Sequence, residues 1–213
     1  KFIPKSDTVR IQKNRNLQLG GTIIAGKVDF VAPEFDFDYD SYTFRMKQID
    51  SLILYVPEGD GRPNEQGIVK LVKSETAIQN LSGTLFIAEP DNKSGSRNNL
   101  KYPYFSSVDT ANTYYDNGKN GDKYSRNDFR FNVTPFEIDS LTVTATENID
   151  LQGELITGGI FEPIKTNLTL QEDNSLGTTI NTTNKGLKLY GDIYCVILLN
   201  NIDWILNWFC KAL

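Results

Sequence analysis

The segment DNGKNGD at residues 116–122 carries the residue types of a calcium-binding loop. Asp116, Asn120 and Asp122 offer side-chain oxygens, which are the ligands that Ca²⁺ prefers. The helix–loop–helix template fails at two positions, because Gly118 stands where a ligand belongs and the twelfth position lacks the required glutamate. The segment therefore predicts either a cation site at Asp116, Asn120 and Asp122 or a plain turn.

Four carboxylates near expected strand ends could serve as the acid and base of a glycoside hydrolase: Glu34, Asp36, Glu137 and Asp139. Such enzymes hold two carboxyl groups about 5–9.5 Å apart across a cleft, a distance that the sequence does not fix. The chain contains no histidine, which excludes Ser–His–Asp and Cys–His catalysis and histidine-ligated zinc. Its glycines do not match phosphate-binding or dinucleotide-binding spacings. We expect neither enzyme activity nor a cofactor.

Aromatic residues are concentrated in the stretch 100–128, which is also rich in turn-forming residues and is expected to be a long excursion. Long ordered loops often carry binding sites, and exposed aromatic rings can stack on sugars. The same rings could instead form the local core of the loop, because aromatic side chains dominate core energetics. Both interpretations apply to the same five residues: Tyr102, Tyr104, Phe105, Tyr114 and Tyr115.

The composition narrows the class of protein. A net charge of −5 and a pI near 4.9 argue against a nucleic-acid partner, which would need a basic stripe. The first residue is Lys1 and the only methionine is Met46, so we expect a processed product or an internal piece of a larger chain, with no signal peptide in it. An acidic chain without cysteine over its first 190 residues, rich in Asn and Thr, is typical of a bacterial envelope or extracellular setting.

The strands that would position these groups are organised around residues 28–56. Alternation places three aromatic residues on one face and three aspartates on the other as far as Asp40. The apolar phase then shifts by one residue, which predicts a bulge or tight turn near Ser41. The aspartates form either a solvated face or, together with another strand, a cation-binding or sugar-binding ladder. Residues 52–56 are apolar throughout, which predicts a strand covered on both faces.

A Leu-x-Gly-x-Leu/Ile pattern occurs three times, at residues 19–23, 81–85 and 151–155. Each copy places two aliphatic side chains and a glycine on one face of a strand, so a neighbouring strand or side chain can approach closely at the glycine. The phrase IDSL also occurs twice, at 49–52 and 138–141, with matching apolar phase before it. This repeated pattern predicts a repeated strand pair.

We predict an all-β fold: an extended or curled multi-stranded sheet, of the β-solenoid or β-taco kind or an open sandwich, followed by a short C-terminal hydrophobic helix. Residues 1–16 form a polar lead-in with at most one short strand, and residues 17–190 form the β-rich module, which has two related halves. Three turn-rich segments offer contact surfaces, at 57–67, 89–128 and 171–186.

The tail 191–213 differs sharply from the body, because it holds both cysteines and both tryptophans of the chain. Its apolar residues recur at helical spacing, and its length approaches the ~20 residues that cross a bilayer. A central Asp203 costs about 2.5–3.5 kcal/mol on insertion. The alternatives are a docked hydrophobic helix and a stretch not native to the module.

Four segments carry a resemblance to very large uncharacterised β-rich envelope proteins of Bacteroidetes: FDYDSYTFRMKQIDSL, LSGTLFIAEPDNKSG, the YYD at 114–116, and FRFNVTPFEIDSL. The strands with the Leu-x-Gly-x-Leu/Ile pattern are also similar to the repeats of AsmA/TamB-type proteins. The first resemblance implies a non-catalytic structural or interaction module whose partners are other segments of a larger chain or envelope components. The second implies a lipid conduit. A glycan-binding or glycan-cleaving β domain is the third hypothesis, and none of the three involves nucleic acid.

Overall fold

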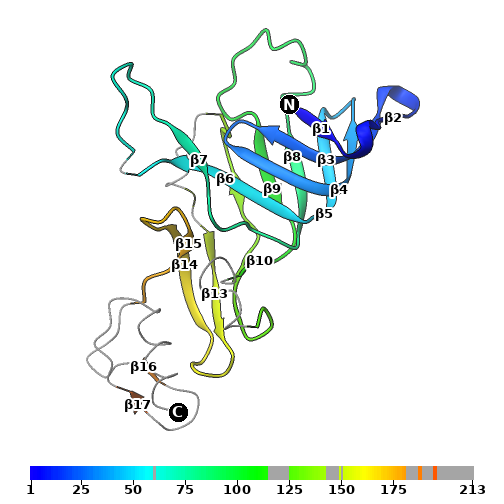
Figure 1. Ribbon diagram of the computed structural model, residues 1–213. Helices are drawn as coiled ribbons and strands as arrows, with labels where there is room; N and C mark the ends of the chain where they lie inside the picture. The colour runs from blue at the N-terminus through cyan, green and yellow to red at the C-terminus, as the bar shows by residue number, and fades with distance from the viewer. Residues whose placement is uncertain are drawn as a thin grey trace.

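The computed structural model describes residues 1–59, 61–114, 125–142, 149, 151–180, 187–188 and 194–195. These residues form two antiparallel sheets, one of them a curled half-barrel, and a further two-stranded pair (Figure 1). The helices among them are two short 3-10 turns, η1 (Lys5–Asp7) and η2 (Lys13–Arg15). The predicted all-β class with a curled sheet is therefore confirmed.

The half-barrel has ten strands, and its main path runs β1-β3-β4-β5-β8-β9-β12, with β2 also on β3 and with β6 on β4 and β7. The strand bounds are β1 (Phe2–Pro4), β2 (Arg10–Ile11), β3 (Leu17–Ala25), β4 (Val28–Asp38), β5 (Thr43–Ile49), β6 (Ser51–Pro57), β7 (Leu71–Lys73), β8 (Leu81–Phe86), β9 (Tyr104–Ser107) and β12 (Glu137–Ile138).

The small sheet has five strands in the order β10-β11-β13-β14-β15. Their bounds are β10 (Ala111–Tyr114), β11 (Phe129–Val133), β13 (Leu151–Thr157), β14 (Ile164–Leu170) and β15 (Leu176–Gly177). The chain enters this sheet after β9 and returns to the half-barrel at β12, so the two sheets are interleaved in sequence. Their buried side chains form one hydrophobic cluster.

The stretch 28–56 forms strands β4, β5 and β6 of the half-barrel. β4 and β5 form its central hairpin, and β6 also pairs with β4. The predicted change of phase at Ser41 is confirmed, because residues 39–42 form a tight turn in which Tyr42 has φ 58°. The backbone N–H of Ser41 donates to Asp38 Oδ1 at 2.8 Å, and this bond closes the turn. A second irregularity was not predicted: Leu19 pairs with Phe35 but Gly21 pairs with Ala32, so β4 gains a residue near Pro33. Proline lacks a backbone donor and is tolerated at such bulges.

Two aromatic contacts record how strongly the sheet curls. Phe2 on β1 and Phe44 on β5 are three strands apart, which is about 14 Å in a flat sheet, yet their ring centroids are 5.1 Å apart. Phe30 on β4 and Phe105 on β9 are also three strands apart, and their centroids are separated by 4.9 Å. The inner face therefore folds over its own side chains, and its rings contact one another across the curl.

The three segments with the Leu-x-Gly-x-Leu/Ile pattern, at 19–23, 81–85 and 151–155, are called glycine-notched below. In each of them a neighbouring strand or side chain approaches the glycine closely, as predicted. A Cβ on Gly83 would lie 2.5 Å from both the Phe105 ring and the Ser106 carbonyl oxygen, and one on Gly153 would lie 2.0 Å from the Asn132 carbonyl oxygen. Gly21 differs, because its φ is 133° and its neighbours are backbone atoms of the 3–5 segment. Two copies are therefore notches under an aromatic ring, and the third is a bulge position.

Several predictions about strands were wrong. The lead-in contains two short strands, β1 and β2, which both pair with β3, so this segment belongs to the sheet. The expected excursion 100–128 contains β9 and β10. In residues 52–56 the side chains alternate between buried and half-buried, so the strand is not fully covered on both faces.

The second IDSL copy differs from the first where it is described, because β12 ends at Ile138 and Ser140 takes φ 53° in a turn. Residues 143–148, which include the rest of the second strand of the predicted pair, lie outside the described residues, so the strand pair itself stays a prediction. Of the predicted C-terminal helix, only Tyr194 and Cys195 lie in the described part of the chain. They form strand β17, paired with β16 (Leu187–Lys188), and are not helical. The remainder of 191–213 lies outside the described residues.

Candidate functional site

The outer face of the half-barrel carries a half-buried aromatic group on β8 and β9. The rings of Phe86 and Tyr104 are stacked, with centroids 4.3 Å apart and an interplanar angle of 5°. Tyr102 meets Tyr104 edge to face at 5.1 Å, and Lys101 Nζ lies 4.5 Å from the Tyr104 centroid. Phe86 therefore covers one face of the Tyr104 ring, and the Lys101 ammonium also lies over this ring. Phe105, by contrast, is fully buried in the core.

Two of the predicted carboxylates, Glu137 and Asp139, belong to the surroundings of this aromatic group. Burial raises the pKa of Tyr104, and negative charge on Tyr102, Glu137 and Asp139 adds to the rise. Both carboxylates are on exposed residues of and beside β12. The aromatic residues and these carboxylates are separate candidates in the sequence, and the fold brings them together.

The four predicted carboxylates fall into two separate groups, Glu34 and Asp36 on β4, and Glu137 and Asp139 on and beside β12. Asp36 and Glu137 lie in the same cross-strand row of the outer face, four strands apart, with Arg45, Thr84 and Ser106 between them. At about 4.8 Å per strand this separation is about 19 Å, well beyond the separation that glycoside hydrolysis uses. Glu34 is on the same strand as Asp36, two positions before it, and belongs to the same group.

The aspartates of the central hairpin make structural contacts. Asp36 accepts a hydrogen bond from Gln18 at 3.0 Å and lies 3.9 Å from Lys47 Nζ. Hydrogen bonds from Ser41 lower the pKa of Asp38. These contacts agree with a solvated strand face whose polar groups fix the hairpin.

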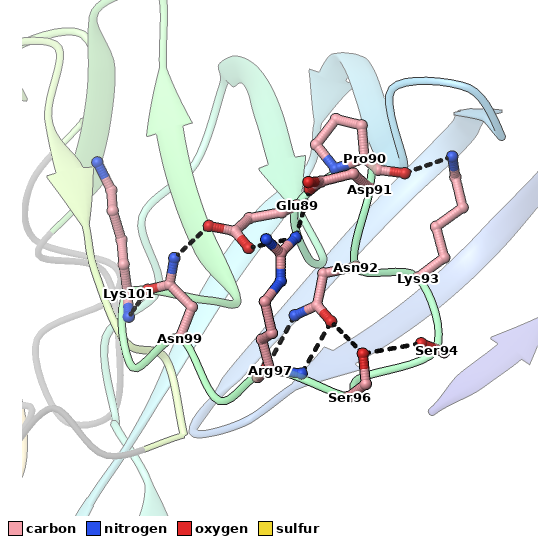
Figure 2. Close-up of polar contacts among 10 residues, drawn as sticks. All are labelled: Glu89, Pro90, Asp91, Asn92, Lys93, Ser94, Ser96, Arg97, Asn99 and Lys101. Carbon is pink, nitrogen blue, oxygen red and sulfur yellow. Dashed lines mark hydrogen bonds and ion pairs between the residues drawn. The ribbon is translucent and has the colours of Figure 1, made fainter.

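The loop at residues 89–101 is organised by side-chain hydrogen bonds and ion pairs (Figure 2). It is built around Asn92, which is 3% exposed. Asn92 Nδ2 donates to the Arg97 carbonyl oxygen at 2.7 Å, and Asn92 Oδ1 accepts from the Arg97 N–H at 3.0 Å. An asparagine side chain satisfied in this way replaces the hydrogen bonds of regular secondary structure. One buried amide therefore holds the loop in a single shape.

Charged side chains of the same loop form a network around Arg97. Its guanidinium Nη2 lies 2.7 Å from Asp91 and 3.4 Å from Glu89, as Figure 2 shows. A hydrogen bond from Arg97 lowers the pKa of Asp91. Asn99 donates to Glu89 Oε1 at 2.7 Å. The loop therefore presents charges of both signs in fixed positions.

Two lysines of this loop contact aromatic side chains of the half-barrel. Lys93 Nζ lies 5.0 Å from the centroid of Tyr39, in the turn between β4 and β5. Lys101 covers Tyr104 on β9, as described above. Both contacts are cation–π interactions, and they connect the loop to strand ends that are far apart in the sequence.

An ion pair between a buried aspartate and an exposed lysine is the third polar cluster of the half-barrel. The side chain of Asp29 is 2% exposed, and its Oδ2 lies 2.8 Å from Lys73 Nζ on β7 and 3.2 Å from the Tyr55 hydroxyl on β6. The hydrogen bond with Asp29 raises the pKa of Lys73, and burial raises that of Tyr55. Oδ1 of Asp29 accepts no hydrogen bond. The pair joins the short edge strand β7 to the centre of the sheet.

The predicted cation site falls on residues that the structure does not describe, since Asp116, Asn120 and Asp122 lie in the gap at 115–124. Elsewhere, the described residues contain no group of three or more metal-ligating side chains. Within the same part of the chain, no helix has the length and apolar character that crossing a bilayer requires.

Comparisons of this chain with protein-family models, with curated proteins and with solved structures gave no match. The resemblance to Bacteroidetes envelope proteins and to AsmA/TamB-type repeats therefore stays a prediction.

Sequence reasoning missed the two residues that organise these clusters, Asn92 and Asp29. The turn-forming run DNKSGS around Asn92 signals a loop, but it does not indicate that the asparagine side chain is buried. The partner of Asp29 is 44 positions away in sequence, and no local pattern connects the two residues.

Proposed function

We propose that this chain is a non-catalytic interaction module of an exported cell-envelope protein, and that the 89–101 loop is its main contact surface. The observation that supports this proposal is the burial of Asn92 at the centre of the loop. A loop that is already ordered loses less conformational entropy on binding. Its partners are envelope components or other segments of a larger chain.

The charge arrangement agrees with a protein or mixed-charge partner. Arg97 and Asp91 are exposed and Lys93 is half-buried, and all three are held within one short loop. Fixed charges of both signs favour specific pairing with a complementary surface. The curled sheet beneath supplies a rigid support, in the manner of a β-taco or open-sandwich module.

A photo-crosslinking experiment in an exporting bacterium tests the proposal. A photoreactive residue replaces Ser94 in the contact loop or, as the control, Glu65 in the 58–70 loop. The control is matched, because Asn64 Oδ1 organises that loop in a similar way by accepting from the N–H groups of Gln66 and Ile68.

We expect a discrete adduct with an envelope component from Ser94 and none from Glu65. Asn92→Ala should reduce the adduct about tenfold, because the loop must then be ordered on binding at a cost of about 1–2 kcal/mol. Equal labelling from both loops, no adduct, or retention of the chain in the cytoplasm would contradict the proposal.

Two alternatives receive less support. Glycan stacking needs an open ring face, whereas Tyr104 is stacked against Phe86 on one face and has the Lys101 ammonium 4.5 Å from its centroid. Glycan-array binding that Tyr104→Ala abolishes would favour it again. A lipid conduit needs an open apolar groove, whereas the six notch-flanking side chains are all buried: Leu19, Ile23, Leu81, Leu85, Leu151 and Leu155.

A further inference from the structure

Exposed apolar side chains gather at one edge of the half-barrel. Phe2 is 50% exposed, Ile3 46%, Val9 43% and Ile11 82%. These four lie within eleven residues of each other in sequence, on or beside the edge strands β1 and β2, which both pair only with β3. The other large exposed apolar residues of the described chain are fewer in any one place: Ile68 and Leu71 lie at and before β7, and Leu100 and Val108 are in separate loops. A concentration of this kind usually marks an interaction site.

The same edge is strongly basic in a chain that is acidic elsewhere. Residues 1–15 hold five basic residues and one acidic residue, Asp7. The rest of the chain therefore holds 17 of the 22 basic residues and 26 of the 27 acidic ones. The five basic residues are all exposed: Lys1, Lys5, Arg10, Lys13 and Arg15. The edge thus combines apolar side chains with positive charge, and the body carries the opposite sign.

The fold holds this edge in place. The N–H of Ile24 donates to the Lys1 carbonyl oxygen at 2.8 Å, and the ring of Phe2 contacts that of Phe44 at 5.1 Å. The segment between β1 and β2 projects from the side of the half-barrel beyond β3 (Figure 1). The apolar and basic side chains are therefore presented together on a preformed rim.

We propose that this rim, residues 1–15, docks on the surface of a membrane that contains anionic lipids, a function additional to that of the 89–101 loop. Apolar side chains next to basic ones match the interfacial region of such a bilayer, where the former enter the acyl boundary and the latter contact headgroups. The acidic body is repelled by the same surface, so the module stands on its edge. Two copies meeting rim to rim would instead oppose like charges.

Co-sedimentation of the full chain with vesicles tests this proposal. We expect binding to vesicles that contain phosphatidylglycerol and little binding to pure phosphatidylcholine. The double variant Ile3→Ser/Ile11→Ser should bind at least about tenfold more weakly, because two exposed apolar side chains no longer leave water. The matched control Leu100→Ser/Val108→Ser removes equally exposed apolar groups and should bind as the unmodified chain does.

A second set of variants tests the electrostatic part. Each of Lys5→Gln, Arg10→Gln and Lys13→Gln should weaken binding about fivefold, because one basic residue near an anionic surface contributes about that factor, and added salt should reduce the difference. Equal binding to both lipids, or equal loss in the Leu100/Val108 control, would overturn the proposal. So would loss of binding together with a change in oligomeric state, which would assign the rim to a second copy. The crosslinking result at Ser94 is independent of all these outcomes.

Discussion

The strand pairs β8–β9 and β13–β11 have the same local design in two different sheets. In each, a Leu-x-Gly-x-Leu strand pairs with a strand whose phenylalanine lies opposite the second leucine: Leu85 with Phe105, and Leu155 with Phe131. In each, that phenylalanine ring approaches the glycine within 2.6 Å of where a Cβ would be. A bare glycine on a strand is thus covered by the neighbouring ring, and this cover restores the packing that glycine lacks.

The two pairs differ in what the ring contacts next. Phe105 meets Phe30 at 4.9 Å and Phe136 at 6.0 Å, so it connects the notch to the curl of the half-barrel. For Phe131 no such ring contact is found within the described residues. The same short motif therefore supports strong curvature in one sheet and a simple close approach in the other. The motif determines how closely the ring approaches the glycine, and the further rings that it contacts determine whether the sheet curls there.

Removal of the covering ring should give the largest effect and the clearest difference between the pairs. We expect Phe105→Ala to lower the free energy of unfolding by about 5 kcal/mol and Phe131→Ala by about 3 kcal/mol, the two ends of the range for buried phenylalanine. The larger cost follows from the lost contacts with Phe30 and Phe136. Urea denaturation followed by far-ultraviolet circular dichroism measures both free energies of unfolding. Phe105→Leu, which keeps a large apolar side chain but removes the ring, serves as the control. Equal losses would show that the curl does not depend on Phe105.

Filling the notch is the complementary change. We expect Gly153→Ala to destabilise the fold by about 3 kcal/mol and Gly83→Ala by about 2 kcal/mol, as for overpacked cores. Gly153→Ala should cost more because its Cβ would lie closer to a neighbouring atom. A Cβ at Gly153 would lie 2.0 Å from the Asn132 carbonyl oxygen, whereas at Gly83 the nearest atoms are 2.5 Å away.

The control for this experiment is Gly177→Ala on β15. Its Cβ would meet only the side chain of Gln171, at 2.8 Å, which can rotate away. The measurement is the same urea midpoint, and the control should change the free energy of unfolding by less than about 1 kcal/mol. A control as destabilised as the notch variants would mean that strand propensity, not close approach, explains all three.

Local patterns in the sequence predicted the features that depend on neighbours in the chain. The notches at Gly83 and Gly153, the turn at Ser41 and the all-β class follow from alternation and from glycine chemistry. The bulge at Pro33 was missed although two signals mark it: the proline itself, and the shift of the apolar positions from Phe30 and Ala32 to Phe35.

Features that depend on distant residues could not be predicted. Burial of Asn92 and the pairing of Asp29 with Lys73 are set by the completed sheet, and so is the meeting of Tyr104 with Glu137. The lead-in was assigned to a polar arm because its residues are charged, yet pairing with β3 makes it a sheet edge. Register and curvature, which place these groups, have no signature within a single strand.

The third glycine-notched segment tests whether the shared pattern implies a shared role. Gly21 has φ 133°, a backbone conformation that side chains rarely adopt, and a Cβ there would lie 2.3 Å from the Ile3 carbonyl oxygen and 2.6 Å from the Lys5 nitrogen. These obstacles belong to the edge, which can move away. We therefore expect Gly21→Ala to cost only about 1 kcal/mol of global stability, less than either notch variant.

The effect of Gly21→Ala should instead be local. Hydrogen exchange should accelerate at the β1 amide that pairs with β3, on Ile3, while the amides of β8 and β13 keep their protection, because an edge opens independently of the core. If Gly21→Ala exposes β8 as well, the bulge is part of the cooperative core and the first copy of the motif resembles the other two. If only β1 opens, the same five-residue pattern performs two different tasks, and the φ of its glycine distinguishes them.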